Sequence, residues 1–105
     1  MTKFWKDMRV VHNKVPPVEL LAQLAEECCE LGHAALKARR AMEALKDLNP
    51  TPVPLHEALT NLAEELRDVQ LTAMACGFRM ATEKELEPKM ERWRMRCLME
   101  EGDGR

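Results

Sequence analysis

The sequence predicts an all-α protein, an antiparallel bundle of about four helices whose core is completed by oligomerisation. Hydrophobic residues make up 46% of the 105-residue chain, but aromatic residues are only 4% and tyrosine is absent. Leu, Ala and Met favour helices, whereas sheets favour β-branched and aromatic residues. Long segments also carry apolar residues alternately three and four positions apart, which is the spacing of a helix-packing stripe. A helical core so poor in aromatic residues often needs a second subunit.

Prolines mark the boundary between the first two predicted helices. Apolar residues at helical spacing predict a short amphipathic helix within residues 1–14, which Pro16 and Pro17 end. The same prolines suit the first turn of the next helix, expected over residues 18–48. Along one face of this second helix, residues alternate four and three positions apart: Leu20, Leu24, Glu27, Leu31, Ala34, Ala38, Ala41 and Leu45.

A proline-rich linker over residues 49–54 precedes the third predicted helix, 55–76. Beyond Asp68 this helix is apolar on nearly all sides, which predicts burial against other helices and again a second subunit. Its expected packing stripe is Leu55, Leu59, Leu62, Leu66, Val69, Ala73 and Cys76.

The fourth predicted helix covers about residues 87–99, after a stop at Gly77. Residues 82–85 read Thr-Glu-Lys-Glu, which has the form of a capping box and is an alternative start. Pro88 therefore either kinks a longer helix or lies in the first turn of a shorter one.

Charge and composition exclude several classes of protein. The net charge of −2 gives no basic excess for binding a nucleic-acid backbone. No apolar run approaches the roughly 18–20 residues that span a bilayer, and residues 1–10 lack a secretory signal, so we expect no membrane partner. The four cysteines form no Cys-x-x-Cys pair, which is typical of reduced thiols in the cytoplasm. One domain is expected over residues 1–105, with 1–15 as an N-terminal segment and 100–105 as a flexible tail.

Two acidic stretches lie inside the second and third predicted helices. Each contains two carboxylates three residues apart, Glu27 with Glu30 and Glu65 with Asp68, and this spacing places both acids on one helix face. Glu27 also interrupts the apolar stripe, and an unpartnered buried charge is costly. On antiparallel helices the four acids would converge, and a hard divalent cation such as Mg²⁺ would remove their repulsion. The alternative is that these acids are solvated helix faces.

The residues around these acids resemble the MazG-like all-α nucleoside triphosphate pyrophosphohydrolases. They are also similar to the related dimeric dUTPases and dCTPases and to phosphoribosyl-ATP pyrophosphohydrolase. The matching segments are residues 24–31 (Leu-Ala-Glu-Glu-Cys-Cys-Glu-Leu) and 64–69 (Glu-Glu-Leu-Arg-Asp-Val). The linker between the two motifs is longer than is usual in the family.

This resemblance implies a metal site and a reaction. Glu27, Glu30, Glu65 and Asp68 would bind Mg²⁺, with Mn²⁺ as a possible substitute. Glu27 would also belong to the catalytic set with Glu26, which would be a further ligand or the base for the attacking water. The implied reaction converts a nucleoside triphosphate, a deoxy or non-canonical one, to the monophosphate and pyrophosphate in a homodimer or homotetramer.

Four further residues are candidates for binding the substrate. Lys89 and Arg92 occupy positions that contact phosphates in similar proteins, and Trp5 and Trp93 are candidates for stacking on a base. The alternative interpretations are surface cations for the first pair and a structural role in the core for the tryptophans.

Two other functions remain open at this level. The first is a non-enzymatic helical interaction or adaptor module whose acids pair with Arg67, with Lys37 or with a partner protein. The second is a degenerate member of the family that binds metal without turnover.

Overall fold

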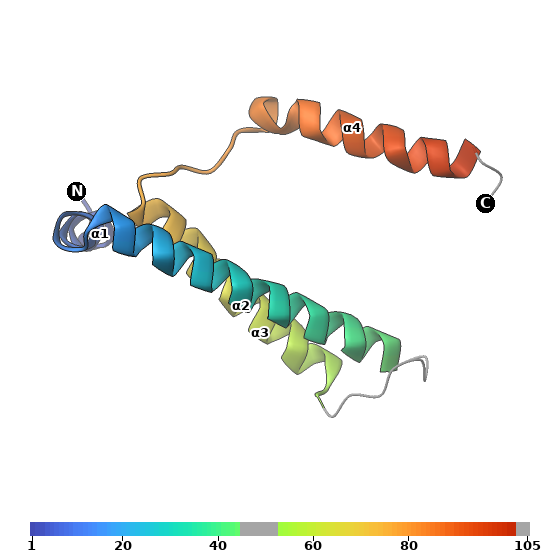
Figure 1. Cartoon of the computed structure of the whole chain (residues 1–105), viewed down its shortest axis with the longest axis horizontal. Coiled ribbons are helices and arrows are strands. Elements are labelled where there is room, and N and C mark those ends of the chain that lie inside the picture. The colour runs from blue at the N-terminus through green and yellow to red at the C-terminus, as the bar shows by residue number, and fades with distance from the viewer. Residues whose placement is uncertain (45–52, 103–105) are drawn as a thin grey trace.

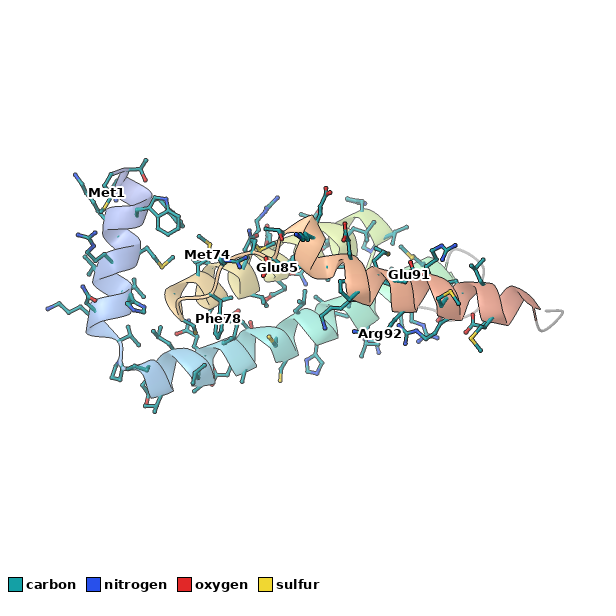
Figure 2. All side chains as sticks on the ribbon, turned by 90° about the horizontal axis from the view of Figure 1, so that it is seen from above. Met1, Met74, Phe78, Glu85, Glu91 and Arg92 are labelled. Atoms are coloured by element: carbon teal, nitrogen blue, oxygen red, sulfur yellow. The ribbon has the colours of Figure 1, made fainter. Side chains whose placement is uncertain are left out.

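The computed structural model describes residues 1–44 and 53–102 of the chain, and it is an all-α bundle as the sequence predicts. Helices α2 and α3 lie side by side and antiparallel, α1 lies across one end of this pair, and α4 stands apart (Figures 1 and 2). The helices are α1 (Lys3–Lys14), α2 (Pro17–Ala44), α3 (Leu55–Ala75) and α4 (Glu83–Gly102).

The boundary between α1 and α2 is where the prolines predict it. The hydroxyl of Thr2 accepts a hydrogen bond from the backbone N–H of Trp5 at 3.4 Å and caps the start of α1. Val15 closes α1 in an extended conformation, and Pro17 is the first residue of α2. The predicted continuation of α2 over residues 45–48 lies outside the described residues, as does most of the linker.

The predicted packing stripe of α2 is confirmed for its described members. Four of them are buried and three are half-buried, whereas Leu45 lies outside the described residues. Buried are Leu20, Ala34, Ala38 and Ala41; half-buried are Leu24, Glu27 and Leu31.

The predicted stripe of α3 is wrong in part. Leu59 and Leu66 were expected to be buried, but their exposed fractions are 40% and 54%. The buried or half-buried residues along α3 are Leu55, Ala58, Leu62, Glu65, Val69, Thr72, Ala73, Met74 and Ala75. The stripe that packs on α2 consists of Leu55, Ala58, Leu62, Glu65, Val69 and Thr72. The error has a physical cause, because α3 carries apolar side chains on two adjacent sides. The less apolar side packs on α2, since the small residues Ala38, Ala41 and Ala58 let the two helices approach closely there. Burial on all sides beyond Asp68 is also not found, since Leu71 is 49% exposed in the single chain.

Helix α1 is held against the start of α2 and the end of α3 by an apolar contact and a hydrogen bond. Met8 packs against Leu20 and Ala75, and the His12 ring Nδ1 donates to the Ala75 carbonyl at 2.7 Å. Gly77 ends α3 as predicted, with φ at 97°, and its N–H donates to the Met74 carbonyl at 2.9 Å.

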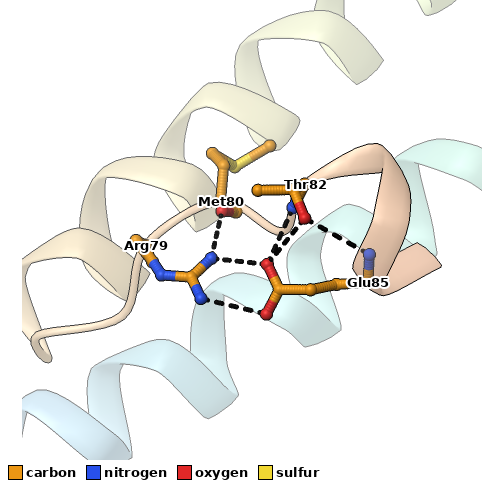
Figure 3. Close-up of polar contacts among 4 residues, drawn as sticks. All are labelled: Arg79, Met80, Thr82 and Glu85. Carbon is orange, nitrogen blue, oxygen red and sulfur yellow. Dashed lines mark hydrogen bonds and ion pairs between the residues drawn. The ribbon is translucent and has the colours of Figure 1, made fainter.

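Helix α4 begins at the capping box, so its predicted start at residue 87 is wrong and the alternative start is correct. The Glu85 carboxylate accepts bonds from the backbone N–H and hydroxyl of Thr82, both at 3.0 Å, and the Thr82 hydroxyl accepts from the Glu85 N–H at 3.2 Å (Figure 3). Arg79 adds a two-pronged ion pair to Glu85, which lowers the pKa of that carboxyl to about 2. These bonds hold the first turn, and Pro88 is accommodated inside the helix.

The far end of α4 also differs from the expectation. The tail predicted over residues 100–105 is helical as far as Gly102, and residues 103–105 lie outside the described residues.

Candidate metal centre

The α2–α3 pair has two different sides, which follow from the register of its packing stripe. The residue that precedes each stripe residue turns toward one side of the pair, and the residue that follows turns toward the other. Because the helices are antiparallel, the preceding positions of both helices share one side. We call this the acid side, and it carries Glu26, Glu30, Glu64 and Asp68.

Three carboxylates meet where this side borders the packed stripe. Ligand oxygens of Glu27, Glu30 and Glu65 all lie within 4.8 Å of one another. Glu27 and Glu65 are half-buried, from facing helices, and Glu30 is exposed beside them. In both half-buried residues the Oε2 atom is buried without a hydrogen-bond partner. Two acidic side chains are thus held together, each with one buried oxygen that no donor satisfies.

The fourth predicted ligand, Asp68, lies next to this group and is exposed. Its charge raises the pKa of both Glu27 and Glu65. The Thr72 hydroxyl donates a hydrogen bond to the backbone carbonyl of Asp68 at 2.8 Å and not to the Asp68 carboxylate.

Burial is the main cause that raises the pKa of Glu27, followed by the charge of Glu30. The pKa of Glu65 is raised by the same two causes in the same order. Removal from water and mutual repulsion both disfavour the ionised forms. The folded chain therefore holds these protons more tightly than the unfolded chain does.

No cation of the chain relieves this repulsion among the described residues. Their ion pairs join Lys3 with Asp7, Arg39 with Glu43, Arg79 with Glu85, and Glu91 with Arg94. Arg67 and Lys37, the predicted partners in an adaptor, form no such pair with the acids within this part of the chain.

The donor set fits a hard divalent cation. All the donors are carboxylate oxygens, which Mg²⁺ prefers, and two oxygens bound to one Mg²⁺ lie at most about 4.2 Å apart. The ligand oxygens lie within 4.8 Å of one another in the structure, so a small side-chain rotation would bring them to this spacing.

Two grooves flank the acids along the same side of the pair. Toward α1 lies a mostly apolar groove of about 430 Å³, whose lining includes Met8, Gln23, Leu71 and Thr72. Gln23 is one turn before Glu27 on the same helix, so this groove adjoins the acid cluster.

Toward the other end of the pair lies a more polar groove of about 540 Å³. Its lining includes Lys37, His56, Asn61 and Glu64. Glu64 precedes Glu65 directly, so the acids lie between an apolar groove and a groove that contains a cation.

The remaining predicted site residues are not brought to the acids within one chain. Lys89, Arg92 and Trp93 are exposed on α4, which stands apart from the α2–α3 pair (Figures 1 and 2). Trp5 is 50% exposed and packs edge-on against Phe4, with ring centroids 5.1 Å apart. Glu26 is exposed on the acid side, one turn from Glu30.

Sequence reasoning did not place several residues in the grooves beside the acids, although it named Lys37 as a possible ion-pair partner of the acids. Lys37 and Asn61 lie in the polar groove, and Met8 and Leu71 in the apolar one. The signal that finds Lys37, Asn61 and Leu71 is their register, since each directly precedes a residue of the packed stripe.

Comparison with known proteins adds no relative. No family model, no curated protein and no solved structure matches this chain. No helix in the described part of the chain is long and apolar enough to cross a membrane.

Proposed function

We propose that this chain hydrolyses a nucleoside triphosphate, a deoxy or non-canonical one, to the monophosphate and pyrophosphate with the help of Mg²⁺. The observation that carries the proposal is the meeting of three carboxylates from facing helices within 4.8 Å, two of them with an unpartnered buried oxygen. The resemblance of residues 24–31 and 64–69 to the MazG-like pyrophosphohydrolases supports the same reaction.

Each acid has a role in this proposal. Glu27, Glu30 and Glu65 would hold the cation, and Asp68 completes the set from the exposed edge. When bound, Mg²⁺ supplies positive charge that offsets the charge of the triphosphate. Glu26 takes the proton of a water molecule that attacks the α-phosphorus, the bond from that phosphorus to the bridging oxygen breaks, and pyrophosphate leaves.

The two grooves support a nucleotide as the substrate. A base and sugar need a mostly apolar surface with a few polar groups, such as the groove that Met8, Leu71 and Gln23 line. A phosphate chain needs cations and hydrogen-bond donors, such as Lys37 and Asn61 in the other groove. The acids lie between the two, where the α- and β-phosphates of a bound nucleotide would lie.

The test is an assay of pyrophosphate release from a panel of canonical and modified nucleoside triphosphates, with Mg²⁺ and with EDTA. We expect Mg²⁺-dependent release from at least one of them. Glu27→Gln should reduce the rate about 100-fold or more, because it weakens the cation site. Glu19→Gln changes the same residue type two turns away on α2 and should retain the rate. Absence of metal-dependent release from every nucleotide would reject the enzymatic proposal.

One observation favours a second function, a helical interaction module. Helix α4 exposes Leu86, Met90, Trp93 and Cys97 at four- and three-residue spacing, as a helix that docks on a partner does. Calorimetric titration with Mg²⁺ or Mn²⁺ separates the two functions, because an interaction module would bind neither ion appreciably. Metal binding without turnover would identify a degenerate pyrophosphohydrolase.

A hydrolase of this kind would act in the cytoplasm, where its cysteines stay reduced. All four cysteines are free in the described part of the chain. Nucleic acid is not a partner in this proposal, since the net charge is −2.

A further inference from the structure

A second groove lies where α1 crosses the end of α3, on the flank away from the acid side. Trp5, Met74 and Gly77 line two adjoining hollows there, of about 430 Å³ and 380 Å³. Because both hollows share these three residues, we treat them as one groove and call it the Trp5 groove.

The register of α3 separates this groove from the acid side. Gln70, which lines the Trp5 groove, directly follows the packed residue Val69. Leu71, which lines the apolar groove beside the acids, directly precedes the packed residue Thr72. The two side chains therefore leave α3 on opposite sides of its packed stripe.

One end of the Trp5 groove is aromatic. Trp5 is 50% exposed and Phe78 is 60% exposed, although both line the same hollow. Phe78 and Met74 lie at the end of α3 nearest α1 (Figure 2). Exposed indole and phenyl rings above a partly apolar floor suit a flat ring, since aromatic rings stack on one another.

The other end of the groove is cationic. Arg9 and His12 line it beside Trp5, and no carboxylate is among the described residues that line either hollow. The His12 ring is held by the Ala75 carbonyl at 2.7 Å. Arg79, in the aromatic hollow, is already paired with Glu85 at 2.7 Å. Arg9 forms no ion pair within the described part of the chain, so its charge is available to a ligand.

We infer that the Trp5 groove binds a nucleoside monophosphate. The base stacks on Trp5 and Phe78, and the phosphate lies against Arg9, whose guanidinium can donate two parallel hydrogen bonds to phosphate oxygens. A nucleoside without phosphate leaves the charge of Arg9 unused, and a sugar phosphate without a base leaves the rings unused. Only a ligand that carries both groups matches both ends of the groove.

This site is distinct from the acid cluster. The acids lie on the other side of the packed stripe, so a ligand in the Trp5 groove leaves them open. The proposed hydrolysis releases a product of the same chemical class, but the groove needs neither Mg²⁺ nor turnover to bind it.

The first test uses Trp5 as its own reporter. The chain has two tryptophans, so Trp93→Phe leaves Trp5 as the single source of tryptophan fluorescence. Titration of this variant with adenosine 5′-monophosphate (AMP) in EDTA should change the emission to a plateau, because the base stacks on the indole ring. Adenosine and ribose 5-phosphate, each of which carries one half of the ligand, should bind about tenfold or more weakly.

Matched variants in the same background separate the groove from the general charge of α1. Arg9→Gln should weaken AMP binding about tenfold or more, because it removes a charge-assisted contact with the phosphate. Lys14→Gln removes the same charge from another face of α1 and should retain the affinity. Glu27→Gln should also retain it, since the acids take no part in this binding.

Several outcomes would overturn the inference. They are equal affinity for adenosine and AMP, an affinity that Arg9→Gln leaves unchanged, and an affinity that Glu27→Gln lowers as much as Arg9→Gln does. Calorimetric titration of the wild-type chain with AMP in EDTA needs no variant, and we expect one site per chain. Absence of binding at millimolar AMP would overturn the inference and leave the groove as a surface for protein contacts. None of these measurements depends on hydrolysis, so they separate this inference from the proposed function.

Discussion

Glu27 and Glu65 face each other across the α2–α3 interface, each with one oxygen that accepts no hydrogen bond. A hydrophobic residue at either position would pack more favourably in the absence of a ligand, since unsatisfied buried acceptors are costly. The two carboxylates therefore lower the stability of the empty fold, and the proposed cation would offset that cost.

Glu65→Gln should raise the thermal stability of the metal-free protein near pH 7. The raised pKa of Glu65 gives stability that is present below its ordinary value of 4.5 and is lost as the pH rises through the raised value. The amide removes one repelling charge, so the advantage of the variant over the wild type should grow as the pH rises above 4.5 and Glu65 of the wild type ionises. Melting curves in EDTA measure this difference.

The control for this prediction is the neighbouring residue. Glu64→Gln alters an exposed acid, whose charge is the smallest of the causes that raise the pKa of Glu65, and should change the melting temperature less. A variant Glu65→Gln that is less stable than the wild type at every pH would contradict the repulsion between these acids.

At the level of the helices, the path of the chain between α3 and α4 is determined by the end of α3 and the start of α4. The turn after α3 requires a positive φ at Gly77, and the Arg79–Glu85 pair with the Thr82 cap fixes the start of α4. Local bonds thus define where α4 begins, although no other helix in the described part of the chain packs along it.

Gly77→Ala should destabilise the chain by about 1–2 kcal/mol, because an L-residue with a side chain is strained at positive φ. A Cβ at this position would meet the His12 Cε1 atom at 3.8 Å, which is an ordinary contact, so the backbone is the source of the cost. Gly77→Asn should lose less, since asparagine tolerates this conformation. Urea unfolding of the three proteins measures the differences, and equal stability of all three would contradict this explanation.

At the scale of the whole molecule, the single chain is too extended for its length. Its radius of gyration is 18.3 Å, whereas a compact chain of this length has about 13 Å. Part of the excess comes from α4, which stands apart (Figure 1). The rest of the packing is one interface between α2 and α3, with α1 across its end, and much of that interface is alanine.

Metal binding should stabilise this thin fold as a whole. A cation that binds only the folded chain at 100 times its dissociation constant adds about 2.7 kcal/mol. We expect the melting temperature to rise with Mg²⁺ and to return on addition of EDTA. Glu27→Gln should lose this response, whereas Glu19→Gln should keep it. A wild-type melting temperature that is independent of Mg²⁺ would contradict the cation site.

The positions of α1, α2 and α3 and the α2 face of the site were predictable from the sequence. Pro16 and Pro17 separate α1 from α2, and Gly77 ends α3, through backbone chemistry that acts locally. The four-three stripe of α2 predicts that Glu27 lies among buried residues. The proximity of Glu30 to Glu27 also follows from the sequence, because the two acids are one helix turn apart on α2.

The side of α3 that packs on α2 was not predictable from the sequence. Leu59 and Leu66 compete with Ala58, Glu65 and Thr72 for the interface, and a single helix does not record which of two adjacent apolar sides its neighbour occupies. The structure placed Glu65 in the packed stripe and left the two leucines exposed. This packing brings Glu65 to Glu27 and leaves Leu59 and Leu66 on the exposed apolar side of the helix pair. It depends on the contact between two helices, so the sequence of α3 alone does not reveal it.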